Sequence, residues 1–185
     1  MAKTTALITG GASGIGRAIG EAMARRGVAV VLADRQIDLA GEVAQAMIDE
    51  GGEAFACELD VRDAVAFASV AREVKERHGS LDYLFNNAGI GVAAEVADYD
   101  VAAWDDVLDV NVRGVAYGIQ AVYPIMRAQG SGHIINTASM AGLLPAGGTT
   151  SYTASKHAVV GLSIALRIEA ARHGVRVSAL CPGVI

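Results

Sequence analysis

The chain of 185 residues has a net charge of −5, with 52% hydrophobic and only 5% aromatic residues. This length suits one domain with a substantial core, so we expect residues 1–185 to form a single domain. The acidic balance gives no electrostatic basis for binding nucleic acid or an anionic membrane. No apolar run approaches the ~18 residues of a membrane span, and Gly10 interrupts the N-terminal segment before a signal peptide could form. We therefore expect a cytoplasmic protein that binds neither nucleic acid nor membrane.

The cysteines and histidines form no pattern typical of a metal site. Cys57 and Cys181 lie far apart in the sequence, and the histidines include no His-x-x-x-His pair. The sequence therefore predicts no bound metal, and it predicts two cysteines that act as small apolar residues in a reducing compartment.

Short apolar runs alternate with longer helical patterns along the chain. The predicted strands are nearly continuous in apolar character, which is typical of a parallel sheet covered on both faces. They span residues 5–9, 28–33, 53–58, 81–86, 133–138 and 175–180, and helical segments begin near Gly14, Ile37, Asp63, Val101 and Ser151. Because parallel neighbours require right-handed crossovers, we expect an α/β fold with a doubly wound parallel sheet in three layers. The expected arrangement is Rossmann-like, with strand order 3-2-1-4-5-6.

Two predicted helices have features that suggest contacts beyond the sheet. The helix around residues 104–126 carries Gly114 and Gly118, a small-residue pair that would let another backbone approach. The helix over residues 152–173 is apolar nearly all round, so it must be covered on more than one side. A second copy could supply that cover, and we expect a homodimer or homotetramer formed through these helices. The alternative is burial by residues that the chain does not contain.

A glycine-rich turn follows the first predicted strand. The sequence Thr-Gly-Gly-Ala-Ser-Gly-Ile-Gly occupies residues 9–16. Glycines at such a turn allow left-handed backbone and close approach of a phosphate, and the next helix directs its N–H groups toward that phosphate. No Lys-Ser/Thr follows as in a P-loop, and Ile15 excludes a Gly-x-Ser-x-Gly hydrolase turn. A purely structural turn is the alternative.

An acidic residue at the end of the second strand favours a dinucleotide. Asp34 follows Gly14 by 20 positions, the spacing at which a carboxylate binds the adenosine ribose hydroxyls. A carboxylate there repels a 2′-phosphate, which favours NAD over NADP. Arg35 could grip that phosphate if its side chain turns inward, so NADP stays possible. The other role open to Asp34 is a helix cap.

Tyr152 and Lys156 form the second chemical feature of the sequence. Residues four apart stand on one face of a helix, so both side chains can reach one ligand. A free phenol is a poor base at neutral pH. A cation ~4 Å away at an effective dielectric of ~20 contributes ~4 kcal/mol to the charged form, and Lys156 would thereby make Tyr152 a usable base.

Seven motifs occur in a familiar order along the whole chain: residues 9–16, Asp60-Val61, Asn86-Asn87-Ala88-Gly89, Asn111, Ser139, Tyr152-x-x-x-Lys156 and Pro182-Gly183. With them the sequence resembles the short-chain dehydrogenase/reductase family, in its compact single-domain subgroup.

The resemblance implies a nicotinamide cofactor, NAD or NADP, and a role for particular residues in binding it. The adenosine and pyrophosphate half would lie on Gly10, Ser13, Gly14, Ile15, Gly16 and Asp34. Asp60 and Val61 would flank the adenine, and Asn87, Ala88 and Gly89 would pass beside the ribose. The nicotinamide half would meet Tyr152, Lys156, Pro182, Gly183 and Ile185. For Asn86, buried structural support is an equal alternative.

The resemblance also implies a reversible hydride transfer between the cofactor and a secondary alcohol or ketone. Tyr152 would exchange the hydroxyl proton, Lys156 would hold the nicotinamide ribose, and Ser139 would hydrogen-bond the substrate oxygen. Asn111 would bend its helix to hold a water that links Lys156 to solvent. Taken alone, Asn111 could be a surface residue that the helix tolerates, and Ser139 an ordinary loop hydroxyl.

The substrate wall and the end of the chain leave two further expectations. Residues 140–146 are apolar, with Ile90 and Val92 expected nearby, which indicates a hydrophobic alcohol or ketone. Family members usually continue past this point with a substrate loop and a seventh strand, so the chain would be a fragment or a shortened protein. The alternative function is a non-catalytic NAD(H)-binding module or partner subunit.

Overall fold

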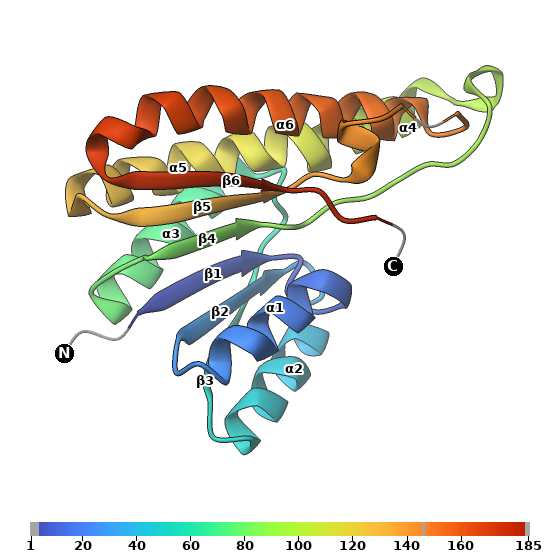
Figure 1. Cartoon of the computed structure of the whole chain (residues 1–185). Coiled ribbons are helices and arrows are strands. Elements are labelled where there is room, and N and C mark those ends of the chain that lie inside the picture. The colour runs from blue at the N-terminus through green and yellow to red at the C-terminus, as the bar shows by residue number, and fades with distance from the viewer. Residues whose placement is uncertain (1–3, 146, 184–185) are drawn as a thin grey trace.

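The computed structural model of the chain describes residues 4–145 and 147–183. Six parallel strands form one sheet in the order β3-β2-β1-β4-β5-β6 (Figure 1). The strands are β1 (Thr5–Thr9), β2 (Ala29–Asp34), β3 (Glu53–Glu58), β4 (Tyr83–Asn86), β5 (Gly132–Thr137) and β6 (Val175–Leu180). The predicted fold and strand order are confirmed. From β1 the chain adds β2 and β3 on one side of the sheet and then returns to add β4 on the other side of β1. Ligands of such sheets bind at this switch point between β1 and β4, beyond the carboxyl ends of the strands.

Helices cover both faces of the sheet. Figure 1 shows α1 (Gly14–Ala24) and α2 (Ile37–Asp49) on one face and α3 (Ala64–His78), α5 (Gly114–Gln129) and α6 (Thr150–Ala170) on the other. Two apolar clusters result, one on each face, because successive strand residues point to opposite sides. In β1, Leu7 belongs to the cluster with α3, α5 and α6, whereas Ile8 belongs to the cluster with α1 and α2.

The helix predicted around residues 104–126 is two helices. Helix α4 (Val101–Leu108) and α5 are separated by a π-helical turn at Asp109–Arg113. The pattern of apolar residues alone does not reveal this turn, because a π turn adds one residue without interrupting the helical hydrogen bonding for long.

Other segments of the same chain approach both Gly114 and Gly118 closely. A Cβ at Gly114 would lie 2.8 Å from a Val61 methyl group, and one at Gly118 would lie 2.1 Å from Asn86 Oδ1. The Val61 backbone oxygen would also lie 3.5 Å from the Gly114 Cβ, so a second backbone does approach Gly114, whereas side chains fill the space beside Gly118. The pair therefore allows α5 to pack against β4 and the segment after β3.

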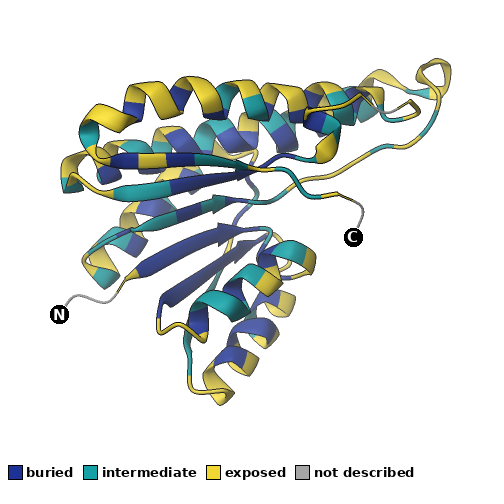
Figure 2. Cartoon of the chain, viewed as in Figure 1, coloured by how far each residue is buried: buried dark blue, intermediate teal, exposed yellow. Residues whose placement is uncertain are grey.

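Helix α6 leaves one apolar face exposed (Figure 2). Ile164 is 57% and Ile168 is 77% accessible, whereas Val159 and Leu166 are buried against the sheet. The described residues thus cover one side of a helix whose composition predicts cover on more than one.

Within residues 4–145 and 147–183, no helix has both the length and the apolar character needed to cross a membrane. The same residues contain no cluster of His, Cys, Asp or Glu suited to a metal ion. Cys57 and Cys181 are partly buried and pack against the larger apolar cluster.

Candidate functional site

A cavity of about 810 Å³ lies at the carboxyl ends of the strands. Its volume falls in the range of about 300–1,000 Å³ typical of ligand and cofactor sites. The predicted site residues in its wall are Gly10, Ser13, Gly14, Ile15, Asp34, Asp60, Val61, Asn87, Ala88, Gly89, Ser139, Tyr152, Lys156, Pro182 and Gly183. Segments that follow all six strands therefore surround one space.

Two predicted residues that the structure describes, Gly16 and Asn111, do not lie in that wall. Gly16 is buried beneath the turn, where a Cβ would lie 2.1 Å from the Gly10 carbonyl oxygen. It lets α1 pack closely against the turn, so its contribution is to backbone packing. Asn111 is fully buried behind the cavity, and Ile185 lies outside the described residues.

The glycine turn has the backbone that phosphate binding requires. Gly10 and Gly14 have φ angles of +64° and +51°, in the left-handed region that favours glycine. Ser13 precedes α1 in an extended conformation and makes no capping hydrogen bond with its side chain. No acidic residue occupies the first turn of α1. The N-terminal N–H groups of this helix and the Ser13 hydroxyl therefore suit an anionic ligand.

Asp34 links the end of β2 to the glycine turn. Its Oδ2 accepts a hydrogen bond from the Ala12 N–H at 3.1 Å, and its Oδ1 accepts one from the Gln36 N–H at 3.0 Å. The side chain does not cap α2, whose N-cap residue is Gln36. Each carboxylate oxygen keeps a second lone pair, so Asp34 can still accept hydrogen bonds from ligand hydroxyls in the cavity.

Asn87 connects the strands at the switch point between β1 and β4. Its Nδ2 donates to the carbonyl oxygens of Thr9 at 3.2 Å and Gly10 at 3.3 Å, and its Oδ1 accepts from Thr137 Oγ1 at 3.3 Å. The Ala88 N–H donates to Thr9 Oγ1 at 3.1 Å. These bonds hold the segment after β4 against the glycine turn.

Asn86 has the structural role that the sequence left open. It is buried outside the cavity wall, and its Nδ2 donates to Asn136 Oδ1 at 2.9 Å. Asn136 Nδ2 in turn donates to Ser163 Oγ on α6 at 2.9 Å. This buried chain joins β4 and β5 to the helix that carries Tyr152 and Lys156.

The ammonium group of Lys156 is held by the sheet. Its Nζ donates to the carbonyl oxygen of Thr137 at 2.8 Å and lies 5.5 Å from the centroid of the Tyr152 ring. The side chain is only 4% exposed. Burial lowers the pKa of Lys156 from 10.5 to about 8, and the nearby Cys181 acts in the opposite sense. Thr137 is missed by sequence reasoning because it contributes a backbone oxygen, which every residue has.

Asn111 fixes the segment after β4. It lies in the π-helical turn, where its Oδ1 accepts from the Ile90 N–H at 2.8 Å and its Nδ2 donates to the Ile90 carbonyl oxygen at 2.8 Å. Asn111 Nδ2 also donates to Ser155 Oγ at 3.0 Å, and Ser155 Oγ donates to the Tyr152 carbonyl oxygen at 2.7 Å. Because Asn111 is fully buried, the alternative of a tolerated surface residue is wrong.

Ser139 follows β5 at the cavity wall. It is the N-cap of a short 3-10 turn, Met140–Gly142, and its Oγ accepts from the Ala141 N–H at 3.1 Å. This leaves the O–H of Ser139 to donate a hydrogen bond elsewhere. Ser139 is therefore a turn residue and also a cavity residue.

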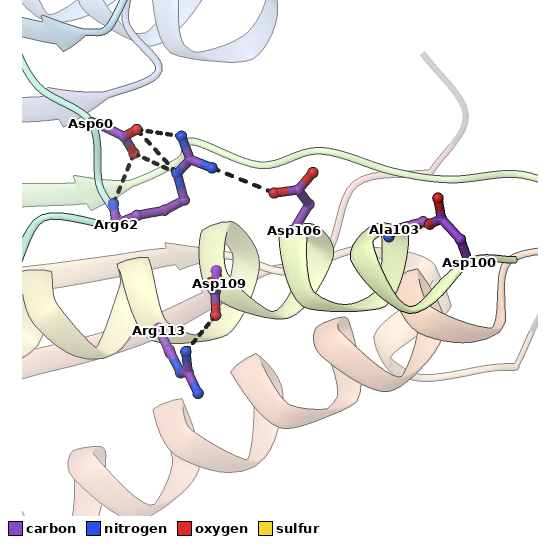
Figure 3. Close-up of polar contacts among 7 residues, drawn as sticks. All are labelled: Asp60, Arg62, Asp100, Ala103, Asp106, Asp109 and Arg113. Atoms are coloured by element: carbon purple, nitrogen blue, oxygen red, sulfur yellow. Dashed lines mark hydrogen bonds and ion pairs between the residues drawn. The ribbon is translucent and has the colours of Figure 1, made fainter.

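A charged group that sequence reasoning missed lies where the cavity wall follows β3 (Figure 3). Arg62 Nε lies 3.0 Å from both carboxylate oxygens of Asp60, and Arg62 Nη2 lies 2.6 Å from Oδ2. Arg62 Nη1 reaches Asp106 Oδ1 on α4 at 3.4 Å. The hydrogen bonds from Arg62 hold the pKa of Asp60 below its usual value. The only sequence signal was that Arg62 comes two residues after the predicted Asp60.

Residues 4–185 match a family model described as short chain dehydrogenase. Levodione reductase of Leifsonia aquatica is 37% identical over 182 residues, which cover 97% of this chain and 68% of that protein. A solved short chain dehydrogenase/reductase from Burkholderia phymatum in complex with NAD has a TM-score of 0.95 and 37% identity, covering 99% of this chain and 66% of that one. A solved NAD+-bound xylitol dehydrogenase has a TM-score of 0.94 and 33% identity, covering 97% of this chain and 70% of that one.

Proposed function

Since the chain belongs to the short-chain dehydrogenase family of oxidoreductases, we propose that it transfers a hydride between a nicotinamide cofactor and a secondary alcohol or ketone. One observation carries the proposal: Tyr152 and Lys156 share a single cavity wall with the glycine turn and Asp34. A proton-transfer group and the features suited to a dinucleotide thus face the same space. The chain spans 68% of the levodione reductase, so the activity is proposed for the full-length protein.

The residues present fit a dinucleotide along the whole cavity. The left-handed glycines and the uncapped start of α1 suit the pyrophosphate, and Asp34 suits the adenosine ribose. Lys156, Pro182 and Gly183 line the opposite part, where the nicotinamide half would bind. We propose NAD as the cofactor because the Asp34 carboxylate would repel a 2′-phosphate. Arg35 also lines the cavity and keeps NADP as an alternative.

The bound nicotinamide supplies the hydride acceptor or donor, and the protein's own residues manage the proton. Tyr152 gives its phenolic proton to the ketone oxygen in reduction and takes the alcohol proton in oxidation. Ser139 donates its O–H to the same oxygen and fixes its distance from Tyr152. Lys156, positioned by the Thr137 carbonyl, holds the nicotinamide ribose. Asn111 orients the segment around Ile90 and, through Ser155, the first turn of α6.

The substrate end of the cavity supports a hydrophobic substrate. Ile90 and Gly91 line it, and a Cβ at Gly91 would lie 3.4 Å from Cδ2 of the Tyr152 ring. Beyond Ser139, Met140, Leu143 and Leu144 present exposed apolar side chains. Ala146, also part of the predicted wall, lies outside the described residues.

We also propose that the protein is cytoplasmic and forms a homodimer or homotetramer. The support is the exposed apolar face of α6 with Ile164 and Ile168. Gly114 and Gly118 on α5 face other residues of the same chain, so they give no support for a contact between subunits. Sedimentation analysis of the full-length protein tests the assembly, and a monomer at micromolar concentration would contradict it.

The test of the function compares Tyr152→Phe with the wild-type full-length protein. We expect the variant to bind NADH with unchanged affinity and to lose at least about 10²-fold in kcat/KM on a secondary alcohol, because the proton-transfer group is gone. Tyr123→Phe removes a phenol on α5 outside the cavity wall and serves as the matched control.

Retention of more than a tenth of the activity by Tyr152→Phe would contradict its role as the proton-transfer group. Tight NADH binding by the wild type without turnover on a broad panel of alcohols and ketones would instead favour the non-catalytic module.

A further inference from the structure

Arg62 joins two elements that lie far apart in the sequence. The guanidinium binds Asp60 after β3 and reaches Asp106 on α4, 44 positions away. Figure 3 shows these three side chains, all of which line the cavity. Asp34 and Arg35 line it as well. The Arg62 side chain therefore links the wall segment after β3 to α4, two parts of the cavity wall that are distant along the chain.

The two contacts of Arg62 differ in strength. Toward Asp60 the guanidinium uses Nε and Nη2, and the Arg62 N–H adds a bond to Asp60 Oδ1 at 3.0 Å. Such a fork geometry is specific to arginine and is the stronger form of ion pair. Toward Asp106 there is one contact at 3.4 Å, between side chains 43% and 61% exposed. The Asp106 contact is therefore the weaker of the two.

Charge explains why Arg62 is needed at this place. Without its guanidinium, Asp34, Asp60 and Asp106 would place three carboxylates at one end of the cavity. A guanidinium can keep its edge N–H groups on two carboxylates while its flat face stays available to an aromatic ring. The group thus reduces the negative charge of this end and offers it a planar surface.

We propose that Arg62 is a positioning residue for the adenosine half of the cofactor, and that its contact with Asp106 closes this end of the cavity and slows release of the cofactor. The inference rests on the proposed function, because that function places the adenine beside Asp60 and Val61. Arg62 sets the orientation of the Asp60 carboxylate, and Asp106 retains the guanidinium across the cavity.

The experiment measures how fast NADH leaves the full-length protein. Excess NAD+ displaces bound NADH in a stopped-flow instrument, and NADH fluorescence reports the dissociation rate. We expect Asp106→Asn to raise this rate about two- to fivefold at low salt, the size of effect expected for one exposed ion pair. Wild-type dissociation should also quicken as salt is added, approaching the rate of Asp106→Asn, because salt screens exposed charges.

Asp109→Asn is the matched control. It removes the same charge near the start of the π-helical turn, where Asp109 pairs with Arg113 at 2.7 Å and lies outside the cavity wall (Figure 3). Asp60 raises the pKa of Arg62 most, and Asp109 also raises it, but less than Asp106 does, so we expect a much smaller change in the dissociation rate than that of Asp106→Asn. An equal acceleration in both variants would show a general charge effect and would overturn the inference.

Arg62→Lys tests the fork itself. Lysine keeps the charge but cannot hold both carboxylates with one planar group, so we expect faster NADH release. Adding Asp106→Asn to Arg62→Lys should give no further acceleration, because the two changes remove one shared contact. Additive effects would overturn the inference.

The possible failures are distinguishable. Normal NADH binding with an unchanged dissociation rate in Asp106→Asn would overturn only the role of the Arg62–Asp106 contact. If the wild type binds no NADH, the proposed function fails, and the inference falls with it.

Discussion

The side-chain amide of Asn111 holds the backbone of Ile90 by two hydrogen bonds of 2.8 Å, one accepted and one donated. This pairing satisfies both backbone polar groups of Ile90, as a strand partner would. The same amide reaches Ser155, whose hydroxyl donates to the Tyr152 carbonyl oxygen. One buried side chain therefore places the segment after β4 and the start of α6 relative to each other.

Replacing Asn111 with Ala should impair both stability and turnover. We expect the free energy of unfolding to fall by about 2–4 kcal/mol. A buried backbone group that loses its partner costs about 1–3 kcal/mol, and the two groups that lose theirs here belong to Ile90, which is partly exposed, so each cost lies in the lower part of that range. We also expect kcat to fall by more than the affinity for NADH, because Tyr152 and the Ile90 segment lose their common support. Urea unfolding, enzyme kinetics and NADH fluorescence titration measure the three quantities.

Asn136→Ala is the control for Asn111. It removes a buried amide with two hydrogen bonds, to Asn86 and Ser163, away from the cavity wall. A comparable loss of stability with a much smaller loss of kcat is expected. If both variants lose kcat in proportion to stability, Asn111 has only a structural role.

The pH dependence of stability should reveal the buried Lys156. Burial lowers its pKa from 10.5 to about 8, so between these values the unfolded chain binds a proton that the folded chain does not. Stability therefore rises with pH across this window, and the penalty is fully present below about pH 8. The penalty is on the order of 3 kcal/mol.

Lys156→Met is the comparison that isolates this effect. The variant has no titrating group at this position, so the wild type should gain about 3 kcal/mol relative to it as pH rises through the window given by the Lys156 pKa. Urea unfolding of both proteins at several pH values measures this difference, in which the titration of other groups cancels. Identical slopes for both proteins would mean that Lys156 keeps an ordinary pKa.

Asp34→Ala should weaken the preference for NAD over NADP. We expect the ratio of dissociation constants to shift at least about tenfold toward NADP, equivalent to about 1.4 kcal/mol, because the repulsion of a 2′-phosphate is lost. Adding Arg35→Ala should reverse part of that gain. Fluorescence titration with NADH and NADPH measures the ratio.

Stability must be followed separately in the Asp34 variant. The Ala12 N–H loses its acceptor, so a lower melting temperature is expected. Asp38→Ala, which removes an exposed acid from the first turn of α2, is the control for charge. An unchanged cofactor ratio in Asp34→Ala would show that Asp34 does not bind the ribose.

Two glycine-to-alanine changes in helices should have opposite effects on stability. A Cβ at Gly118 would lie 2.1 Å from Asn86 Oδ1 and 2.8 Å from Phe67 Cζ, so Gly118→Ala should destabilise by about 1–3 kcal/mol. At Gly161 a Cβ would meet nothing within 4 Å, so Gly161→Ala should stabilise by up to about 1 kcal/mol. Urea unfolding measures both. Stabilisation by both changes would show that α5 can shift away from β4.

The fold was largely predictable because its signals are local. Apolar runs with regular spacing identified the strands of the sheet within one or two residues at each end, and right-handed crossovers restrict how they can be wound. The glycine turn and Tyr152-x-x-x-Lys156 were recognisable for the same reason, since each lies within a short stretch of chain. These features depend on neighbouring residues and therefore appear in the sequence itself.

Only the tertiary structure decided two kinds of contact: those between distant segments and those with backbone atoms. Lys156 is held by the backbone carbonyl of Thr137, and because every residue has such a carbonyl the sequence does not identify it. The Arg62 contact with Asp106 joins two different elements. The side chains that fill the space beside Gly114 and Gly118 likewise come from other elements. The sequence by itself thus determined the order of elements and the chemical groups, whereas three-dimensional packing decided which groups meet, because packing brings together residues whose separation along the chain carries no periodic signal.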